Sequence, residues 1–525
     1  MKRVVYISIL VMLLTGSSSC KKYLSLDPPN DLSGNNFWKT KADVENFTNG
    51  MYELFRKSMS RPDMKAPPSV SSANEFAFLP FSGDLRGAPI YENPVGFVRY
   101  YFGALANNDI RLLLNPNPPS RPPYNWYNVF QFERFTEWDR FYQVIAAANI
   151  AYDRIDDVTD ASLTEADKKR YKAEAVFLRS ICYFLMVRQF GDVPYYTDAY
   201  HTDPLKRMPM VDVLKNCVAD LKAVKDDLPW TYEDPVFVSV RAMKGSSLAL
   251  LMHLNMWLAS FDAGNDKVYY EEVDKLGDEL QNENGGAYYL LPLENSGEIF
   301  KGRSKEGLFE VPQNANYGES FGWSSIHDFV AYSLPGMGTR TSQMYWDPKF
   351  IEVLYPNGQP DKRSTIWFDP ATLRTYGNDP RTFRMRKFLI SSDPNAIDGF
   401  GFDASQTIFR LTDAILLQAE ALAELGNDGK AQQKVNIVRD RAGAPPFTVV
   451  GEELKNEIFF ERCRELIGEG HYWYDVVRTR RIIDLNYKFG YHCSVDQYKA
   501  GAWTWPIHRS ALINNPGITL NTYWQ

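Results

Sequence analysis

The clearest helical pattern in the chain runs from Thr164 to Phe190. Apolar side chains recur there at the i, i+4, i+7 and i+8 spacing that places them on one face of an α-helix: Phe177, Ile181, Phe184 and Leu185. Thr164 and Asp167 have the spacing of a capping box, which satisfies free backbone N–H groups at a helix start. Gly191 and Pro194 follow the last apolar position and predict the end of the helix.

Similar helical patterns lie on both sides of this segment. They predict helices over 41–56, 138–152, 211–228, 241–259, 268–281, 408–425, 430–441 and 452–480. We expect the last helix to break near Gly468 and Gly470, and the short gap after residue 425 indicates an αα-hairpin. Stacked helix pairs of about 34 residues are typical of tetratricopeptide-type arrays. The sequence therefore predicts a mostly α fold, an α-α superhelix of tetratricopeptide-type helix pairs at about 38–57, 138–283 and 407–442, with long loop-rich insertions.

Two long segments, about 58–125 and 284–405, break the helical pattern. Pro, Gly, Asn and aromatic residues dominate both, and only short strands are indicated, at 307–311 and 384–390. Loops of this length in a compact protein are commonly functional or disordered, and their aromatic content argues against disorder. We therefore expect the ligand-binding regions here.

The first 20 residues form a bacterial lipoprotein signal. Lys2 and Arg3 precede an apolar run from Val4 to Leu14, which is too short to span a bilayer. Small residues lead to Cys20, the expected acceptor of the lipid, so residues 1–19 are a signal peptide. Residues 20–36 are polar and form a tether to the folded part. The alternative is an ordinary secreted protein with a chance cysteine.

Composition narrows the range of partners. The net charge of −7 and the isoelectric point of about 5.6 argue against a nucleic-acid partner. The 12 Trp, 31 Tyr and 32 Phe are enough to build a core and also line an exposed site. Cys182 and Cys463 lie in helical patterns and are expected to be buried thiols, while pairing among these two, Cys217 and Cys493 stays open.

Acidic residues near the C-terminus suggest catalysis at first sight. Glu461 and Glu465 are four residues apart on one helix face, and glycosidases use two carboxylates. Carboxylates on successive turns of one helix normally pair with nearby arginines, here Arg462, Arg464 and Arg478. A hydrogen bond between His471 and Asp475 is plausible, but no nucleophile motif accompanies it. We expect no catalytic residues.

Five segments together resemble the SusD/RagB family of outer-membrane lipoproteins. The strongest is AEAVFLRSICYFLMVRQFGDVP, at 173–194. The others, in the family's order, are residues 37–55, 415–445, 461–478 and 505–521. His508 and Leu520 depart from the family's closing motif, in which proline and glutamine are usual. The resemblance spans nearly the whole chain and implies one SusD-like domain over residues 37–525.

The resemblance carries several expectations about function. It implies a mostly helical, non-catalytic lipoprotein that binds oligosaccharides, or in some branches peptides. It also implies an outer-membrane, cell-surface location and a partner, a TonB-dependent transporter of the SusC type, over which the protein closes like a lid. Lys21 and Lys22 stand where surface-exported members often carry acidic residues, so the leaflet rests on the resemblance alone. We expect no cofactor and no metal, and no calcium loop of EF-hand type is present in the sequence.

Ligand contacts are expected in the two loop-rich regions, where aromatic rings can stack on sugars and polar groups can bind their hydroxyls. The first region supplies Asp84, Arg86, Tyr91, Asn107 and Asn108, and the second Asn314, Asn316, Tyr317, Phe321 and Trp323. The alternative for each residue is packing within its loop. Trp126, Tyr127 and Trp138 are assigned to the core. Two rival functions stay open: a surface glycosidase, and a binding protein for peptides or another non-glycan nutrient.

Overall fold

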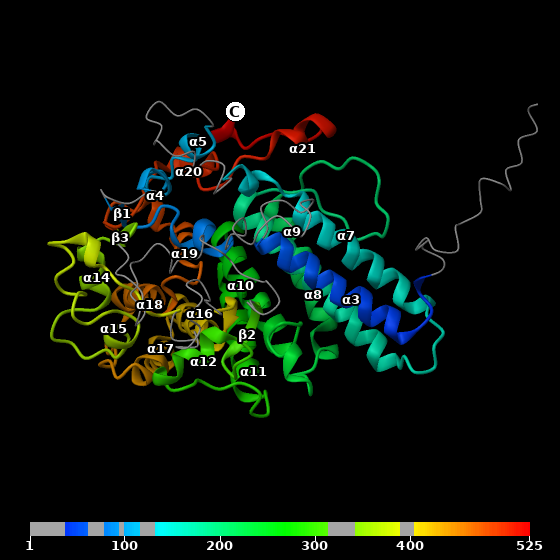
Figure 1. Ribbon diagram of the computed structural model, residues 1–525, viewed down its shortest axis with the longest axis horizontal. Coiled ribbons are helices and arrows are strands. Elements are labelled where there is room, and N and C mark those ends of the chain that lie inside the picture. Colours follow the sequence, from blue (N-terminus) through cyan, green and yellow to red (C-terminus); the bar gives the residue numbers. More distant parts are fainter. Residues whose placement is uncertain (1–36, 61–77, 94–98, 116–131, 313–341, 389–403) are drawn as a thin grey trace, which may run out of the picture.

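The computed structural model describes residues 37–60, 78–93, 99–115, 132–312, 342–388 and 404–525 and is mostly helical (Figure 1). The longer helices are α3 (Lys41–Ser60), α7 (Asp139–Arg154), α8 (Glu165–Phe190), α9 (Met210–Val224), α10 (Lys244–Phe261), α11 (Asp266–Asn282), α16 (Leu411–Glu424), α17 (Asp428–Arg441) and α18 (Gly451–Leu466). The shorter ones are α4 (Arg99–Ala106), α5 (Ile110–Leu113), α12 (Ser296–Lys301), α14 (Pro348–Leu354), α15 (Arg363–Ile366), α19 (Tyr472–Arg478), α20 (Val495–Lys499) and α21 (Arg509–Asn514). Four short strands are present in the described part: β1 (Ile90–Glu92), β2 (Gly307–Val311), β3 (Met344–Trp346) and β4 (Gln406–Arg410).

Helix α8 follows the sequence pattern closely. The Thr164 hydroxyl accepts a hydrogen bond from the Asp167 N–H at 3.1 Å, and the Asp167 carboxylate accepts one from the Thr164 N–H, so the predicted capping box is confirmed. Gly191 ends the helix with a φ of +75°, which a residue without Cβ adopts without strain. From Ala173 onward every side chain of α8 is buried, which makes this helix the centre of the core.

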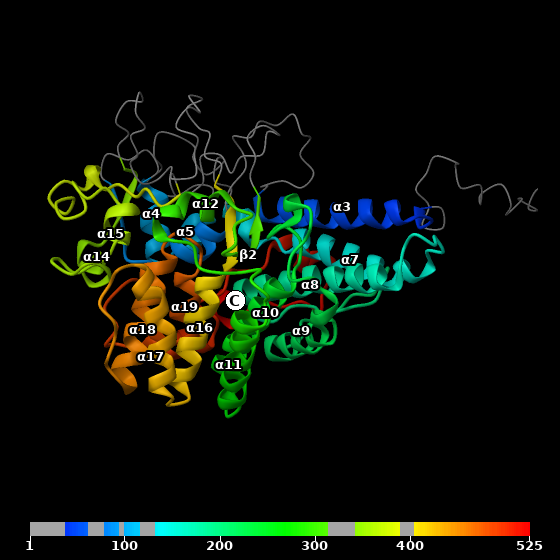
Figure 2. The same cartoon turned by 90° about the horizontal axis from the view of Figure 1, so that it is seen from below.

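The helices pack as antiparallel neighbours, and the predicted tetratricopeptide-type arrangement is confirmed. Helix α7 packs on α8, α10 on α11, and α16 on α17. Helix α11 also packs on α16, and α16 on α18, so the pairs continue into one layered array (Figures 1 and 2). Helix α3 lies along α7 and α8 at one end of this array in both views.

The strands correct two sequence expectations. Residues 406–410 form β4, antiparallel to β2, so the helix predicted from Ile408 begins only at Leu411. All five side chains of β4 are buried, the polar Gln406, Thr407 and Arg410 included, so the segment lacks the alternation of apolar and polar residues that would have marked a strand. The predicted strand at 307–311 is confirmed as β2. The strand predicted at 384–390 is wrong in its described part, where only a single bridge joins Met385 to Phe368.

The loop-rich regions hold more structure than predicted. The first contains α4, α5 and β1, and the second contains α12, α14, α15 and β3. The break in the last long helix is confirmed, since Gly468 and Gly470 have φ values of +87° and +91° between α18 and α19. An added Cβ at Gly470 would lie 2.6 Å from the Cβ of Leu79, so this turn also needs the close approach that glycine allows.

The four cysteines that the structure describes are free thiols, and Cys182 and Cys463 are buried as expected. Trp138 is buried in the core, while Trp126 and Tyr127 lie outside the described residues. None of the helices in the described part of the chain combines the length and apolar character that a membrane crossing requires. The signal peptide, Cys20 and the tether at 20–36 also lie outside that part.

Candidate functional site

An exposed pair of tyrosines stands on the small β1–β3 sheet. Tyr91 and Tyr345 are direct partners in the antiparallel register, and their ring centroids are 5.6 Å apart at an interplanar angle of 45°. Half of the Tyr91 side chain is exposed, and Tyr345 is half-buried. Two adjacent rings that face solvent form a surface on which a sugar can stack, with both phenol groups available for hydrogen bonds. We call this pair the tyrosine platform.

Alternation along the strands decides which side chains face outward. Ile90 and Trp346 are buried, whereas Tyr91 and Tyr345 point to the opposite face. Behind Tyr345, the Tyr376 ring makes an edge contact at 6.3 Å, and the Tyr376 hydroxyl donates to the Trp346 carbonyl at 3.0 Å. The platform is therefore held from behind by the core, which limits the entropy that a ligand must remove.

A carboxylate borders the platform. Asp347 follows β3 directly and caps α14 by accepting the Lys349 N–H at 2.9 Å. Its other oxygen, Oδ2, lies 3.4 Å from the Tyr91 hydroxyl, which donates to it. Burial and then Asp347 raise the pKa of both Tyr91 and Tyr345, so both phenols keep their protons at neutral pH. The platform thus offers two phenol groups and one carboxylate, with the Tyr91 O–H donated to Asp347.

Three of the residues proposed from the first loop region are buried. The Arg86 guanidinium lies 4.5 Å from the Trp473 ring and 5.1 Å from the Trp505 ring, and it donates to Asn108 Oδ1 at 2.9 Å. The Asp84 carboxylate accepts the Gly470 N–H, and burial raises the pKa of Asp84 to about 7. Because protein partners surround Asp84, Arg86 and Asn108, their position favours a structural role and corrects the expectation that they face a ligand.

The structure describes only one further residue of the proposed contacts, Asn107, besides Tyr91. Asn107 is exposed, and its amide donates to the Gly103 carbonyl at the end of α4, so its contact with a ligand stays a prediction. The second loop set lies outside the described residues: Asn314, Asn316, Tyr317, Phe321 and Trp323. Tyr345 was missed in the sequence because nothing local reveals its pairing with Tyr91. Residues 344–346 are Met, Tyr and Trp, which show no alternation of apolar and polar residues that could mark the strand.

Glu461 and Glu465 sit inside a buried ion network. Neither side chain is exposed. Glu461 pairs with Arg363, Arg439 and Arg464 at 2.7–3.1 Å. Of the three arginines named from the sequence, only Arg464 pairs with one of these two carboxylates, Glu461, in the described residues. Arg462 and Arg478 instead bind Asp475.

The network opposes acid catalysis by these carboxylates. Burial alone would raise the pKa of Glu461, but Arg363, Arg464 and Arg439 outweigh it and lower the pKa to about 2. The pKa of Glu465 is also lowered, since Arg441, Arg410 and Arg363 outweigh burial. A glycosidase acid needs a raised pKa and access to the sugar, and this pair has neither.

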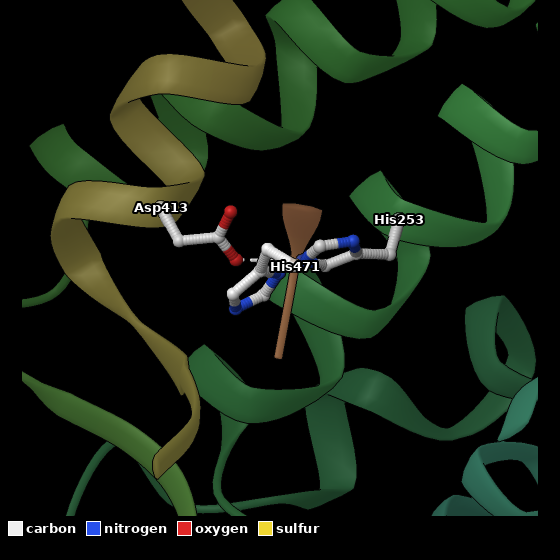
Figure 3. A group of neighbouring side chains, drawn as sticks. All are labelled: His253, Asp413 and His471. Carbon is white, nitrogen blue, oxygen red and sulfur yellow. Dashed lines mark hydrogen bonds and ion pairs between the residues drawn. The ribbon is translucent and has the colours of Figure 1, made fainter. Parts of the chain in front are cut away.

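His471 does not take the partner expected from the sequence. Asp475 binds Arg462 and Arg478 instead, and His471 lies beside His253 and Asp413. Figure 3 shows the three side chains converging from α10, α16 and the residue before α19. The His253 Nε2 lies 2.6 Å from Asp413 Oδ2, and this contact links α10 to α16. Burial lowers the pKa of His471 to about 4 and also lowers that of His253, so both rings are neutral at pH 7.

Two imidazoles and a carboxylate are a donor set that zinc and iron use. Here the donor atoms lie within 4.8 Å of one another, but the short His253–Asp413 contact is a hydrogen bond. The two imidazoles stack at 5.7 Å and 21°, and the Arg462 guanidinium is 2.9 Å from Asp413 Oδ1. A divalent ion would have to enter a buried site beside a fixed cation. We interpret the group as a structural link, and the expectation of no metal stays a prediction.

A concave surface lies at the ends of α10, α16 and α19. This cleft has a volume of about 610 Å³, and its lining carries both signs of charge. Lys455 pairs with Glu424 at 3.0 Å, and Arg478 pairs with Glu420, so much of the charge is already matched. Its lining includes one aromatic residue, Tyr270, and therefore no stacked ring pair.

Sequence comparisons place the chain near one group of proteins. A family model described as the SusD family matches residues 339–524. A second model, described as starch-binding associating with outer membrane, matches residues 113–254. A SusD-like protein of Formosa agariphila is 24% identical, and the match covers 98% of each chain.

Solved structures agree with these matches. A SusD homolog from Bacteroides thetaiotaomicron is 39% identical, with a TM-score of 0.81, over 93% of this chain and 100% of that one. A laminarin binding SusD-like protein is 20% identical, with a TM-score of 0.63, over 92% of this chain and 99% of that one. The second similarity concerns the fold alone.

Proposed function

The chain belongs to the SusD family, and on that premise we propose that it captures an oligosaccharide at the cell surface for a TonB-dependent SusC-type outer-membrane transporter. Proteins of this family bind glycans at the cell surface. The observation that carries the proposal for this chain is the tyrosine platform with Asp347 at its edge. A structural neighbour with the same fold is described as a laminarin binding SusD-like protein.

The proposed mechanism needs no chemical step. A sugar face stacks on Tyr91 and Tyr345, and its hydroxyls exchange hydrogen bonds with the phenols and with Asp347. The lipid on Cys20 keeps the protein beside its transporter, and the tether at 20–36 gives it room to move as a lid. Captured ligand then passes to the transporter unchanged.

Truncating the platform is expected to weaken glycan binding. Tyr91→Ala and Tyr345→Ala should each reduce affinity about tenfold, because each removes one stacking ring and one phenol donor. Isothermal titration calorimetry against starch, laminarin and mannan oligosaccharides measures the loss. Tyr289→Ala is the matched control, since Tyr289 is equally exposed, at 51% against 50% for Tyr91, but lies away from the β1–β3 sheet.

Two results would redirect the proposal. Unchanged affinity in both platform variants would move the glycan site elsewhere. New reducing ends after incubation with any of the glycans would favour the glycosidase.

The alternative of a peptide ligand rests on the charged cleft at the ends of α10, α16 and α19, because charged groups of both signs suit a zwitterion better than a neutral sugar. Binding of a dipeptide panel with no glycan binding would favour that alternative.

Loss of the lipid acceptor is expected to free the protein from the membrane. Cys20→Ala removes the thiol that would carry the diacylglyceryl group, so the protein should move from the pelleted to the soluble fraction. Ultracentrifugation of cell lysates followed by immunoblotting measures the shift, with Cys493→Ala as the control. Pelleting that persists in Cys20→Ala would contradict the lipid anchor.

Strains that express affinity-tagged wild-type or Cys20→Ala protein test the partnership with the transporter. Wild-type protein purified from detergent-solubilised membranes is expected to bring down an outer-membrane β-barrel transporter. The Cys20→Ala protein should bring down less of it, because the lipid no longer concentrates the two proteins at one surface. A wild-type preparation free of any transporter would contradict the SusC-type partner.

A further inference from the structure

The tyrosine platform carries a negative charge that is held in place. Asp347 is fixed at both oxygens, since Oδ1 caps α14 through the Lys349 N–H and Oδ2 accepts the Tyr91 hydroxyl. Its backbone N–H also donates to the Pro89 carbonyl at 2.8 Å, just before β1. The carboxylate therefore belongs to the framework of the platform and cannot swing away from a ligand without breaking these contacts.

Among the residues that the structure describes, the neighbouring charges leave this carboxylate dominant at the platform. Glu92 lies on the other face of β1, where its Oε2 is 2.8 Å from the position that a Cβ on Gly103 would take. Glu352 and Arg374 pair with each other at 3.2 Å. Arg86, the cation that the sequence suggested for this region, is enclosed between two indole rings. Asp347 is the charged group that raises the pKa of both platform phenols.

We infer that Asp347 makes the platform select neutral oligosaccharides over glycans that carry carboxylate or sulfate groups. This inference rests on the proposed function and names the ligand class of the same site. A neutral sugar can donate its hydroxyls to Asp347, whereas an anionic sugar stacked on Tyr91 brings like charge toward Oδ2. If a ligand carboxylate or sulfate lies about 4 Å from the Asp347 carboxylate, the repulsion between the two charges in bulk water weakens binding about fivefold. Partial burial of the pair increases this effect.

Affinity electrophoresis tests the inference with matched polymers. Gels contain starch, laminarin or mannan, or the same polymer with its C6 hydroxyls oxidised to carboxylates. The wild-type protein is expected to be retarded by a neutral polymer and at least fivefold less by its oxidised form. Asp347→Asn keeps the size, the acceptor oxygen and the helix cap while removing the charge, so it should narrow this difference to about twofold or less.

The controls separate the possible failures. Lys349→Ala removes the nearest cation along the chain and, unlike Asp347→Asn, should not narrow the difference between the two polymers. Tyr91→Ala should reduce retardation by the neutral polymer about tenfold, in line with the expected loss of affinity. Equal retardation by neutral and oxidised polymers in the wild type, or a difference that persists in Asp347→Asn, would overturn the inference while leaving glycan binding intact. No retardation by any polymer would instead reject the proposed function, and the inference with it.

Discussion

Replacing Glu465 with Gln is expected to lower the free energy of unfolding by about 3–5 kcal/mol. Glu465 contacts three buried guanidinium groups: Arg363 at 2.8 Å, Arg410 at 2.9 Å, and Arg441. All four side chains are at least nine-tenths buried. Removing the carboxylate charge leaves these cations with fewer anions in a region that water does not reach, which costs more than an exposed pair could.

Other anions limit the loss without replacing Glu465. Arg410 keeps Glu306 and Glu469, and Arg363 keeps Asp361 and Glu461. Glu465 differs from these anions because it connects three elements to α18 at once. Its partners are Arg410 in β4, Arg441 in α17 and Arg363 in α15. We therefore expect the helix packing around α18 to weaken as a unit, without a change in the exposed tyrosine platform.

Urea unfolding followed by circular dichroism measures this effect. Glu452→Gln is the matched control, because Glu452 lies on the same helix and pairs with Lys455 but its side chain is 87% exposed. That variant should change stability by less than about 0.5 kcal/mol. A loss below about 1 kcal/mol in Glu465→Gln would show that the network relaxes around the missing charge.

The ion network also explains why this part of the sequence suggested catalysis. Acidic and basic residues at helical spacing predict ion pairs along one helix, but the arginine partners of Glu465 lie 24 to 102 residues away in the chain, and no local pattern can name them. The prediction that Glu461 and Glu465 pair with arginines is therefore confirmed. The choice of Arg462 and Arg478 was wrong for these two carboxylates, because those arginines reach Asp475 and Glu420 instead.

The helices could be predicted because their signals are local. The capping box at Thr164 and the glycines at 468 and 470 fix helix ends through neighbouring residues alone. The site could be predicted only in part. Arg86 resembles a binding residue in a polar, aromatic segment, but Trp473 and Trp505 enclose it from about 400 residues away in the chain. Tyr345 gave no local signal, since its role depends on pairing with Tyr91 across 254 residues.

The stabilising contribution of His471 is expected to disappear as the pH falls. The pKa of this ring is lowered by burial to about 4 in the folded chain, against about 6.5 in an unfolded chain. Between these values the unfolded state binds a proton that the folded state does not, so acidification favours unfolding. The contribution is complete above pH 6.5, is lost toward pH 4, and amounts to about 3 kcal/mol. His253 acts in the same direction, since burial lowers its pKa too.

Two buried carboxyls oppose this trend, which is why a variant is needed. Burial raises the pKa of Asp84 and of Glu310 to about 7, so the folded state binds their protons first and gains stability as the pH falls toward their unfolded values near 4. Whole-protein stability can therefore change little between pH 7 and pH 4. The stability difference between wild type and His471→Gln removes the contributions that the two proteins share.

That difference is expected to fall by about 3 kcal/mol from pH 7.5 to pH 4, measured by urea unfolding at half-unit intervals. His201→Gln is the matched control. His201 is near the surface, and the hydrogen bond that its ring donates to the Asp198 carboxylate raises its pKa, so its contribution should be small and should instead be lost as the pH rises. A difference for His471→Gln that is constant with pH would mean that the ring binds its proton equally in both states. The interpretation of the His253–Asp413–His471 group as a structural link with neutral imidazoles would then be wrong.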